Sequence, residues 1–229
     1  MQNLIDTIEL PLFPLNTVLF PGQVLPLHIF EERYRLMIRH CLAEDKPFGV
    51  VLIQQGQEVG APADPYPVGT IARIVESSRL PNGTLNIISV GVERFRIRRL
   101  IHDQPYLRGE VETFPMAEPG DNPAVARLTQ QVRQQVARYI ELIADAAGLR
   151  IQVGNVPDAP QQVSYLAAVA MQIDNREKQR LLDAASVHGI LAAEVSLLNR
   201  ENALLTWMAR TKAWPDRMQF GASGTLLPN

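Results

Sequence analysis

Side chains that could catalyse a reaction are sparse in this sequence. Its four histidines lack the spacing of a metal site, and its one cysteine, Cys41, cannot build a cysteine-rich zinc site or an internal disulfide. A serine–lysine dyad would have to use one of three lysines, which we expect on the surface or in a turn: Lys46, Lys178 and Lys212. Glycine-rich phosphate-binding loops and the Gly-x-Ser-x-Gly nucleophile motif are absent from the sequence. The sequence therefore predicts a protein that is not an enzyme and that uses neither a metal nor a cofactor.

The segment ERFRIRR is the sharpest charged feature of the chain. Strand alternation would place Arg94, Arg96 and Arg98 on one face and Phe95 on the other. Three interpretations stay open: a solvated outer face backed by core residues, contact with acidic or backbone groups of a protein partner, and binding of RNA phosphates. A net charge of −2 and the few aromatic side chains nearby make nucleic acid the weakest of the three.

The apolar stretch PLFPLNTVLFPGQVLPLHIFEERY is the second feature that could carry a function. Its prolines argue against a membrane-spanning helix and against a central β-strand. Short strands broken by a Pro21-Gly22 turn fit the pattern, and so does an apolar binding surface on a stiff backbone. A small-molecule or hydrolase site is a further alternative. That site would require four side chains to converge: His28, Glu31, Arg33 and Tyr34.

These side chains must be positioned by a chain that changes its hydrophobic period near residue 115. Before that point, short runs of alternating apolar and polar residues predict β-strands. The runs GTIARIVESSRL and TLNIISVGVERFRI flank Asn82-Gly83, which predicts a type I′ hairpin, and Gly91 predicts a bulge in the second strand. Helical spacing of apolar residues predicts one embedded helix over about residues 31–43. The N-terminal half is therefore expected to be a β-rich domain.

The segment EPGDNP separates this half from a helical one. Asn122 is a suitable N-cap and Pro123 a suitable first helical residue. Helical periods then recur along the chain, ending with a helix from about Ser186 to Arg210. We predict a β-domain over residues 1–117, an all-α helical bundle over 118–212 and an irregular C-terminal tail over 213–229.

The composition is that of a folded protein, with 46% hydrophobic and 20% charged residues in a chain of 229. A net charge of −2 gives no overall attraction to nucleic acid or to an anionic membrane. The N-terminal sequence MQNLIDTIELP lacks the basic region and the long apolar core of a signal peptide. We therefore expect a cytoplasmic protein.

The order of motifs resembles the N-terminal substrate-binding domain of Lon proteases. The resemblance rests on the proline-rich stretch, then FGVVL, then YPVGTIARIVESSRLPNGTLNIISVGVERFRI, with further similarity in YLAAVAMQI and KQRLLDAAS. It is nearest to stand-alone bacterial versions of the domain, and cereblon carries a related one. The resemblance implies an α+β fold, a PUA-like β-barrel with one embedded helix followed by a helical bundle. The ATPase and protease domains of full Lon proteases do not occur in these 229 residues, and one cysteine cannot build the zinc site of cereblon.

We therefore hypothesise a non-catalytic module that binds unfolded or degron-bearing polypeptide, or one specific protein partner, along a sheet edge or between the two domains. RNA binding through the arginines of ERFRIRR is the alternative, and an assembly role for the last helix also stays open. The sequence leaves the oligomeric state undecided. The candidate contact residues are Phe20, Pro21, Leu25, His28, Phe30, Arg33, Tyr34, Arg94 and Phe95.

Overall fold

The computed structural model describes residues 7–58, 60, 63–118, 120–149 and 156–211. The chain divides into two compact units, Met1–Pro115 with Asn175–Asp183, and Met116–Asp174 with Ala184–Asn229. The predicted tail over 213–229 lies outside the described residues. Each unit is described below by itself.

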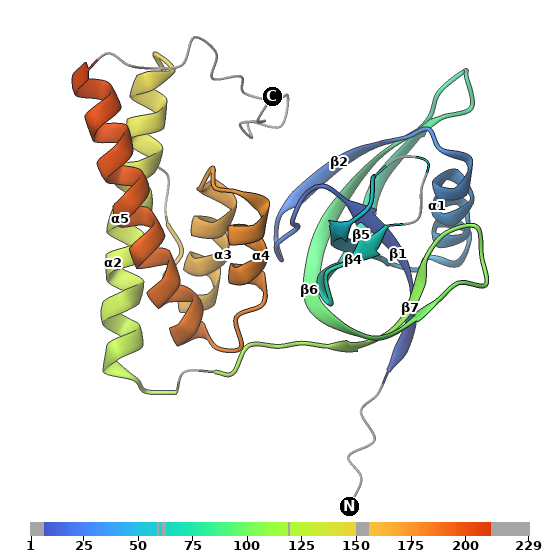
Figure 1. Cartoon of the computed structure of the whole chain (residues 1–229), viewed down its shortest axis with the longest axis horizontal. Helices are drawn as coiled ribbons and strands as arrows, with labels where there is room; N and C mark the ends of the chain where they lie inside the picture. The colour runs from blue at the N-terminus through green and yellow to red at the C-terminus, as the bar shows by residue number, and fades with distance from the viewer. Residues whose placement is uncertain (1–6, 59, 61–62, 119, 150–155, 212–229) are drawn as a thin grey trace, which may run out of the picture. The chain divides into compact units, whose positions relative to one another are not determined.

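The first unit is built on a mixed seven-stranded sheet (Figure 1). Its strands are β1 (Ile8–Leu15), β2 (Val24–Ile29), β3 (Phe48–Gln55), β4 (Asp64–Pro65), β5 (Val68–Arg79), β6 (Leu85–Ile101) and β7 (Arg108–Thr113). Antiparallel pairings run from β1 through β7, β6 and β5 to β3, and a parallel pairing of β3 with β1 closes them into a ring. Strand β2 pairs with β6 outside this ring, and β4 pairs with β3.

Two apolar cores hold the first unit together. One core takes residues from all five strands of the ring and therefore fills its interior. Its buried members are Leu10, Leu12, Val51, Ile71, Phe95 and Val111. The other core forms where the embedded helix α1 (Glu32–Glu44) packs on the sheet through Tyr34, Met37, Ile38 and Cys41. Burying these large apolar side chains is the main favourable term in the folding of this unit.

The hairpin between β5 and β6 differs from the predicted type I′ turn. Gly83 donates to the carbonyl of Leu80 at 2.9 Å, and Leu80 donates to the carbonyl of Thr84 at 2.9 Å. A type I′ turn requires positive φ at both Asn82 and Gly83. Gly83 has φ +81°, but Asp45 is the one described non-glycine residue with positive φ, so Asn82 does not meet this requirement. The prediction was wrong because Pro81 fixes φ near −65°, which favours a type I turn followed by a left-handed glycine.

The predicted bulge at Gly91 is confirmed by the register of β5 and β6. Ala72 pairs with Gly91 and Ile71 with Glu93, so Val92 is the extra residue. A side chain at position 91 has no room, because an added Cβ would lie 2.4 Å from the carbonyl oxygen of Phe20. Gly91 thus lets the segment before β2 approach the backbone of β6.

The second unit contains α2 (Pro123–Ala146), α3 (Pro160–Ala170) and α5 (Val187–Thr211) (Figure 1). The predicted start of α2 is confirmed, because Asn122 Oδ1 accepts from Ala124 N at 2.9 Å and Pro123 is the first helical residue. Apolar side chains from all three helices are buried, among them Val132 on α2, Val163 on α3 and Leu198 on α5. The helices therefore form a shared core within this unit.

Helix α4 (Asn175–Leu182) departs from the predicted domain limits, since residues 175–183 group with the first unit. Gln179 Nε2 donates to the carbonyl of Val68 at 3.0 Å, and Arg94 donates to the carbonyl of Leu182 at 2.5 Å. Asn175 Nδ2 also donates to Asn16 O at 2.7 Å. Helical periodicity predicts such a segment without showing which partners it will find. Here two α4 side chains donate to backbone carbonyls of the first unit, and Arg94 of β6 donates to the Leu182 carbonyl of α4.

Candidate functional site

Four of the nine candidate contact residues are buried: Phe20, Tyr34, Arg94 and Phe95. Phe95 lies in the core of the ring, and Tyr34 stacks on Phe13 with ring centroids 4.1 Å apart. Burial raises the pKa of Tyr34 to about 12, so its hydroxyl stays protonated at neutral pH. Burial makes these four residues part of the packing of the first unit and not contact residues for a partner. The sequence misled because an apolar segment stiffened by prolines can form a core as well as a surface.

The arginines of ERFRIRR do not form an open cationic track. Arg94 is buried, and its guanidinium lies 4.6 Å above the ring of Phe114. Arg96 covers the same ring at 4.0 Å, while Arg98 forms an ion pair with Glu112 at 2.6 Å. Cation–π contact and ion pairing therefore already engage the groups that RNA phosphates would need.

Glu31 and Arg33 serve the local structure at the start of α1. Arg33 Nε donates to Glu31 Oε2 at 3.1 Å, and the same carboxylate accepts from Gly60 N at 3.3 Å. Arg33 also donates to the carbonyl of Glu58 at 3.4 Å. These contacts link Glu58 and Gly60 to the start of α1, whereas His28 bonds Asn86, so the four side chains of the expected hydrolase site do not all converge.

The exposed candidates, His28 and Phe30, lie on β2 or directly after it. The outward side chains of β2 lie beside those of β6, and β6 in turn pairs with β5. Val24 pairs with Val90, Pro26 with Ile88 and His28 with Asn86, so these six side chains cover one face of the β2–β6 pair. On the opposite face Leu25, Leu27 and Ile29 pack on the core under α1. The side chains of β2 are therefore divided by period-2 alternation into a core row and a surface row.

A bulge in β5 extends this surface. Ile74 pairs with Ser89 and Glu76 with Ile88, which leaves Val75 as the extra residue beside Ile88. Val75 is 61% exposed and Val24 is 55% exposed. We call the group Val24, Pro26, Val75, Ile88, Val90 and Val92 the outer face; it combines exposed and half-buried apolar side chains on three neighbouring strands. Arg73 and Glu76, which pair with Val90 and Ile88, border these apolar side chains, and an exposed apolar patch with a polar rim is typical of an interaction site.

One end of the outer face carries polar and aromatic groups. His28 Nδ1 lies 2.6 Å from Asn86 Oδ1, and the His28 and Phe30 rings lie 6.2 Å apart at 22°. Both His28 and Phe30 are exposed. The arrangement offers a ring for stacking next to groups that bond a peptide backbone.

The other end is fixed by the predicted turn at Pro21-Gly22, which the structure contains. Gln23 N donates to Phe20 O at 3.1 Å, and Gly22 has φ +82°, as a type II turn requires. Among the described strands β2 pairs with β6 alone, so its second edge has no strand partner there. Pro26 has no N–H to donate to a strand added at this edge. Binding of a partner through side chains of the outer face is therefore favoured over pairing of a strand with the edge of β2.

Sequence reasoning named none of the six residues of the outer face and found only the residues at one end of it. It singled out His28 and Phe30, with the half-buried Pro21, Leu25 and Arg33 close by in sequence. The signal that could have found the rest is the presence of apolar residues at both alternating positions of LNIISVGV, which predicts a strand with two apolar faces.

Other kinds of site find little support in the described part of the chain. No group of three or more histidine, cysteine or acidic side chains there could hold a metal ion. Within the same residues, every helix is too short or too polar to cross a bilayer. Cys41 is buried, which raises the pKa of its thiol to about 11 and keeps it in the unreactive protonated form.

Comparison with protein families gives a match over residues 9–200 to the ATP-dependent protease La (LON) substrate-binding domain. Lon protease 2 of Myxococcus xanthus is 29% identical over 199 residues, covering 86% of this chain and 24% of its own length. Lon protease of Koribacter versatilis is 31% identical over 188 residues, covering 80% of this chain and 23% of its own length. The chain thus spans about a quarter of the length of these curated relatives.

Solved structures of the same kind share the fold. The Lon N-terminal domain protein from Xanthomonas campestris is 26% identical with a TM-score of 0.61, covering 87% of this chain and 98% of that one. The N-terminal domain of the Mycobacterium avium complex Lon protease has a TM-score of 0.65 at 20% identity, over 86% of this chain and 98% of that one, and is a likeness of fold alone. These matches confirm the resemblance that the N-terminal motifs predicted.

Proposed function

Since the chain belongs to the Lon substrate-binding domain family, we propose that it recognises polypeptide through the outer face of β2, β5 and β6. The single observation that carries this proposal is the apolar surface formed by Val24, Val75 and their half-buried neighbours on three strands. An unfolded segment has apolar side chains that such a surface can cover. The fold is of the PUA-like barrel type in this proposal, and it acts as a rigid support for recognition without chemistry of its own.

The partner in this proposal is an extended polypeptide segment with apolar side chains. Such a segment loses conformational freedom when it binds, so a rigid surface that does not need to reorganise improves affinity. The type II turn and the bulges at Val75 and Val92 supply that rigidity, because each fixes the direction of an apolar side chain. The Phe30 ring adds a large apolar group at one end.

The test is binding of a fluorescent, reduced and carboxymethylated protein that cannot fold. The double variant Val24→Ser, Val75→Ser removes two exposed apolar side chains, each worth about 1 kcal/mol on partial burial, and should weaken binding at least tenfold. Leu42→Ser on α1 is the matched control, since Leu42 is also an exposed apolar residue of the first unit. Thermal unfolding of each variant checks that the fold is intact.

Salt separates this proposal from an electrostatic one. Apolar binding should persist at high salt, whereas binding to phosphates falls steeply as counterions are released. Equal affinity of the outer-face variant and the wild type would contradict the proposal, as would binding that disappears in high salt.

A further inference from the structure

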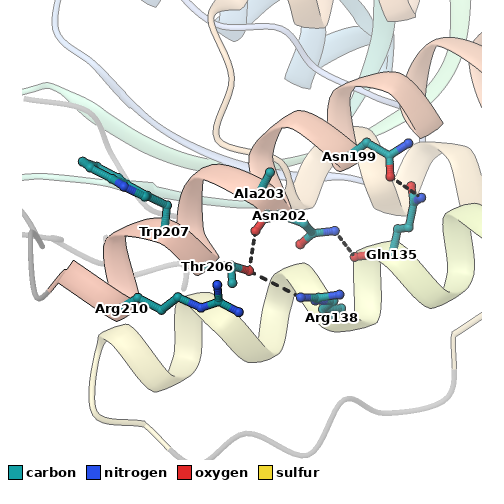
Figure 2. Close-up of a pocket in the computed structure, with 8 residues that line it drawn as sticks. All are labelled: Gln135, Arg138, Asn199, Asn202, Ala203, Thr206, Trp207 and Arg210. Carbon is teal, nitrogen blue, oxygen red and sulfur yellow. Dashed lines mark hydrogen bonds between the residues drawn. The ribbon is translucent and has the colours of Figure 1, made fainter.

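A hollow of about 400 Å³ lies between α2 and α5 in the second unit (Figure 2). Its lining is unlike the outer face, because amide, hydroxyl and guanidinium groups dominate it. The lining residues are Gln135, Arg138, Asn199, Asn202, Ala203, Thr206, Trp207 and Arg210.

The floor of the hollow is a connected polar network. Gln135 Nε2 donates to Asn199 Oδ1 at 2.8 Å, and Asn202 Nδ2 donates to the Gln135 carbonyl at 3.1 Å. Asn202 is only 7% exposed, and its Oδ1 and the Oε1 of Gln135 have no hydrogen-bond partner among the described residues. Buried acceptors normally have partners, so these two oxygens make the packing of α2 against α5 beneath the hollow less favourable.

Two cations, Arg138 and Arg210, line the hollow without an acidic partner among the residues that the structure describes. Figure 2 shows Arg138 from α2 and Arg210 from α5 reaching the same space beside Thr206, to which Arg138 donates at 3.4 Å. Neither guanidinium pairs with a carboxylate in the described part of the chain, whereas Arg133, which also lies on α2, pairs with Asp158 at 2.5 Å. A pair of unneutralised arginines favours a carboxylate, which each can bind with two parallel hydrogen bonds.

An exposed aromatic side chain lies at the rim of the hollow. Trp207 is 58% exposed, and its neighbour Leu204 on α5 is also exposed. A large exposed indole costs free energy in water and is a frequent anchor in protein interfaces. The hollow thus combines cations, an exposed amide at Asn199 and an aromatic ring.

We propose that this hollow binds an acidic segment of a second polypeptide. A carboxylate of that segment lies between Arg138 and Arg210, its backbone groups face the exposed amide of Asn199, and an apolar side chain covers Trp207. A peptide supplies donors, carboxylate and apolar group together, whereas a bare phosphate supplies no apolar group. The site is independent of the outer face and stands on the other unit.

The experiment uses the full chain and a fluorescein-labelled peptide of alternating glutamate and leucine. The matched peptide with glutamine in place of glutamate tests the need for charge. The variant Arg138→Glu, Arg210→Glu should weaken binding of the acidic peptide more than tenfold, and Trp207→Ala should weaken it several-fold. Arg127→Glu is the matched control, because Arg127 is exposed on α2 and outside the hollow, and it should change binding less than twofold.

Several results would overturn the proposal. Equal binding of the glutamine peptide, or an equal loss from Arg127→Glu, would remove the specific role of the two arginines. A short RNA that binds as tightly and is lost with the same variants would make the hollow a general anion site. Helix content measured by circular dichroism shows that each variant folds, and Arg138→Gln, Arg210→Gln repeats the test without charge reversal. The outer-face variant should leave this binding unchanged.

Discussion

Replacing Glu194 should stabilise the helical unit, and should do so increasingly as the pH rises. Glu194 lies on the buried face of α5 with 0% of its side chain exposed, and neither carboxylate oxygen has a hydrogen-bond partner among the described residues. Burial alone raises the pKa of this carboxyl well above its usual range. The buried group therefore prefers to stay neutral, while in the unfolded chain it ionises near its ordinary pKa of about 4.3.

The sign and the size of the effect follow from this difference. Below the unfolded pKa the carboxyl is neutral in both states and costs no ionisation energy. As the pH rises toward the folded pKa, the unfolded state gains stability by losing a proton, at about 1.4 kcal/mol per pH unit. Glu194→Gln removes that slope, and Glu194→Leu also removes a buried polar group without a partner.

Urea unfolding followed by far-UV circular dichroism between pH 5 and 8 measures the effect. The free-energy difference between Glu194→Gln and wild type should grow with pH by about 1.4 kcal/mol per unit and become constant above the folded pKa. Glu141→Gln provides the control, because Glu141 is exposed on α2. A difference that does not depend on pH would refute the reasoning, since it would mean that the folded protein holds Glu194 in its ordinary ionisation state.

Three further predictions concern the first unit. Gly91→Ala should destabilise the protein by about 1–3 kcal/mol in urea, because the added Cβ would lie 2.4 Å from the Phe20 carbonyl oxygen. Gln179→Leu should speed amide exchange in α4 by at least tenfold, since it removes the 3.0 Å bond to the Val68 carbonyl; unchanged protection would show that this bond does not hold the helix. Cys41 should react with iodoacetamide at pH 8 only after unfolding in urea, because burial raises the pKa of its thiol to about 11; rapid labelling of the folded protein would contradict this.

The elements of the fold were largely predictable from local patterns. Alternation and turn residues locate the strands, and the capping pair Asn122-Pro123 locates the start of α2. The type of the β5–β6 turn was not predicted correctly, because Pro81 and Asn-Gly favour different turns and the proline prevailed. The assignment of α4 to the first unit depends on bonds between residues about a hundred positions apart, which periodicity does not encode.

The site was harder to predict than the fold. Phe20 and Phe30 look equivalent in the sequence, yet the first is buried and the second is exposed. The Pro21-Gly22 turn between them reverses the chain direction. Whether each ring points into the core or toward solvent therefore depends on tertiary packing. Likewise, the apolar stripe of α5 gave no sign that Glu194 and Asn202 share its buried face.

The closed ring of strands also constrains how the protein can be made. Ile8 in the first strand pairs with Val111, so the N-terminal strand leaves the ribosome about a hundred residues before its β7 partner exists. Helix α4 comes later still, after α2 and α3 have been translated. Although β3 can pair with β1 earlier, the edge of β1 that pairs with β7 and the apolar side chains of the ring core stay exposed during that interval. A module proposed to recognise unfolded chains is therefore itself an unfolded chain for much of its own synthesis.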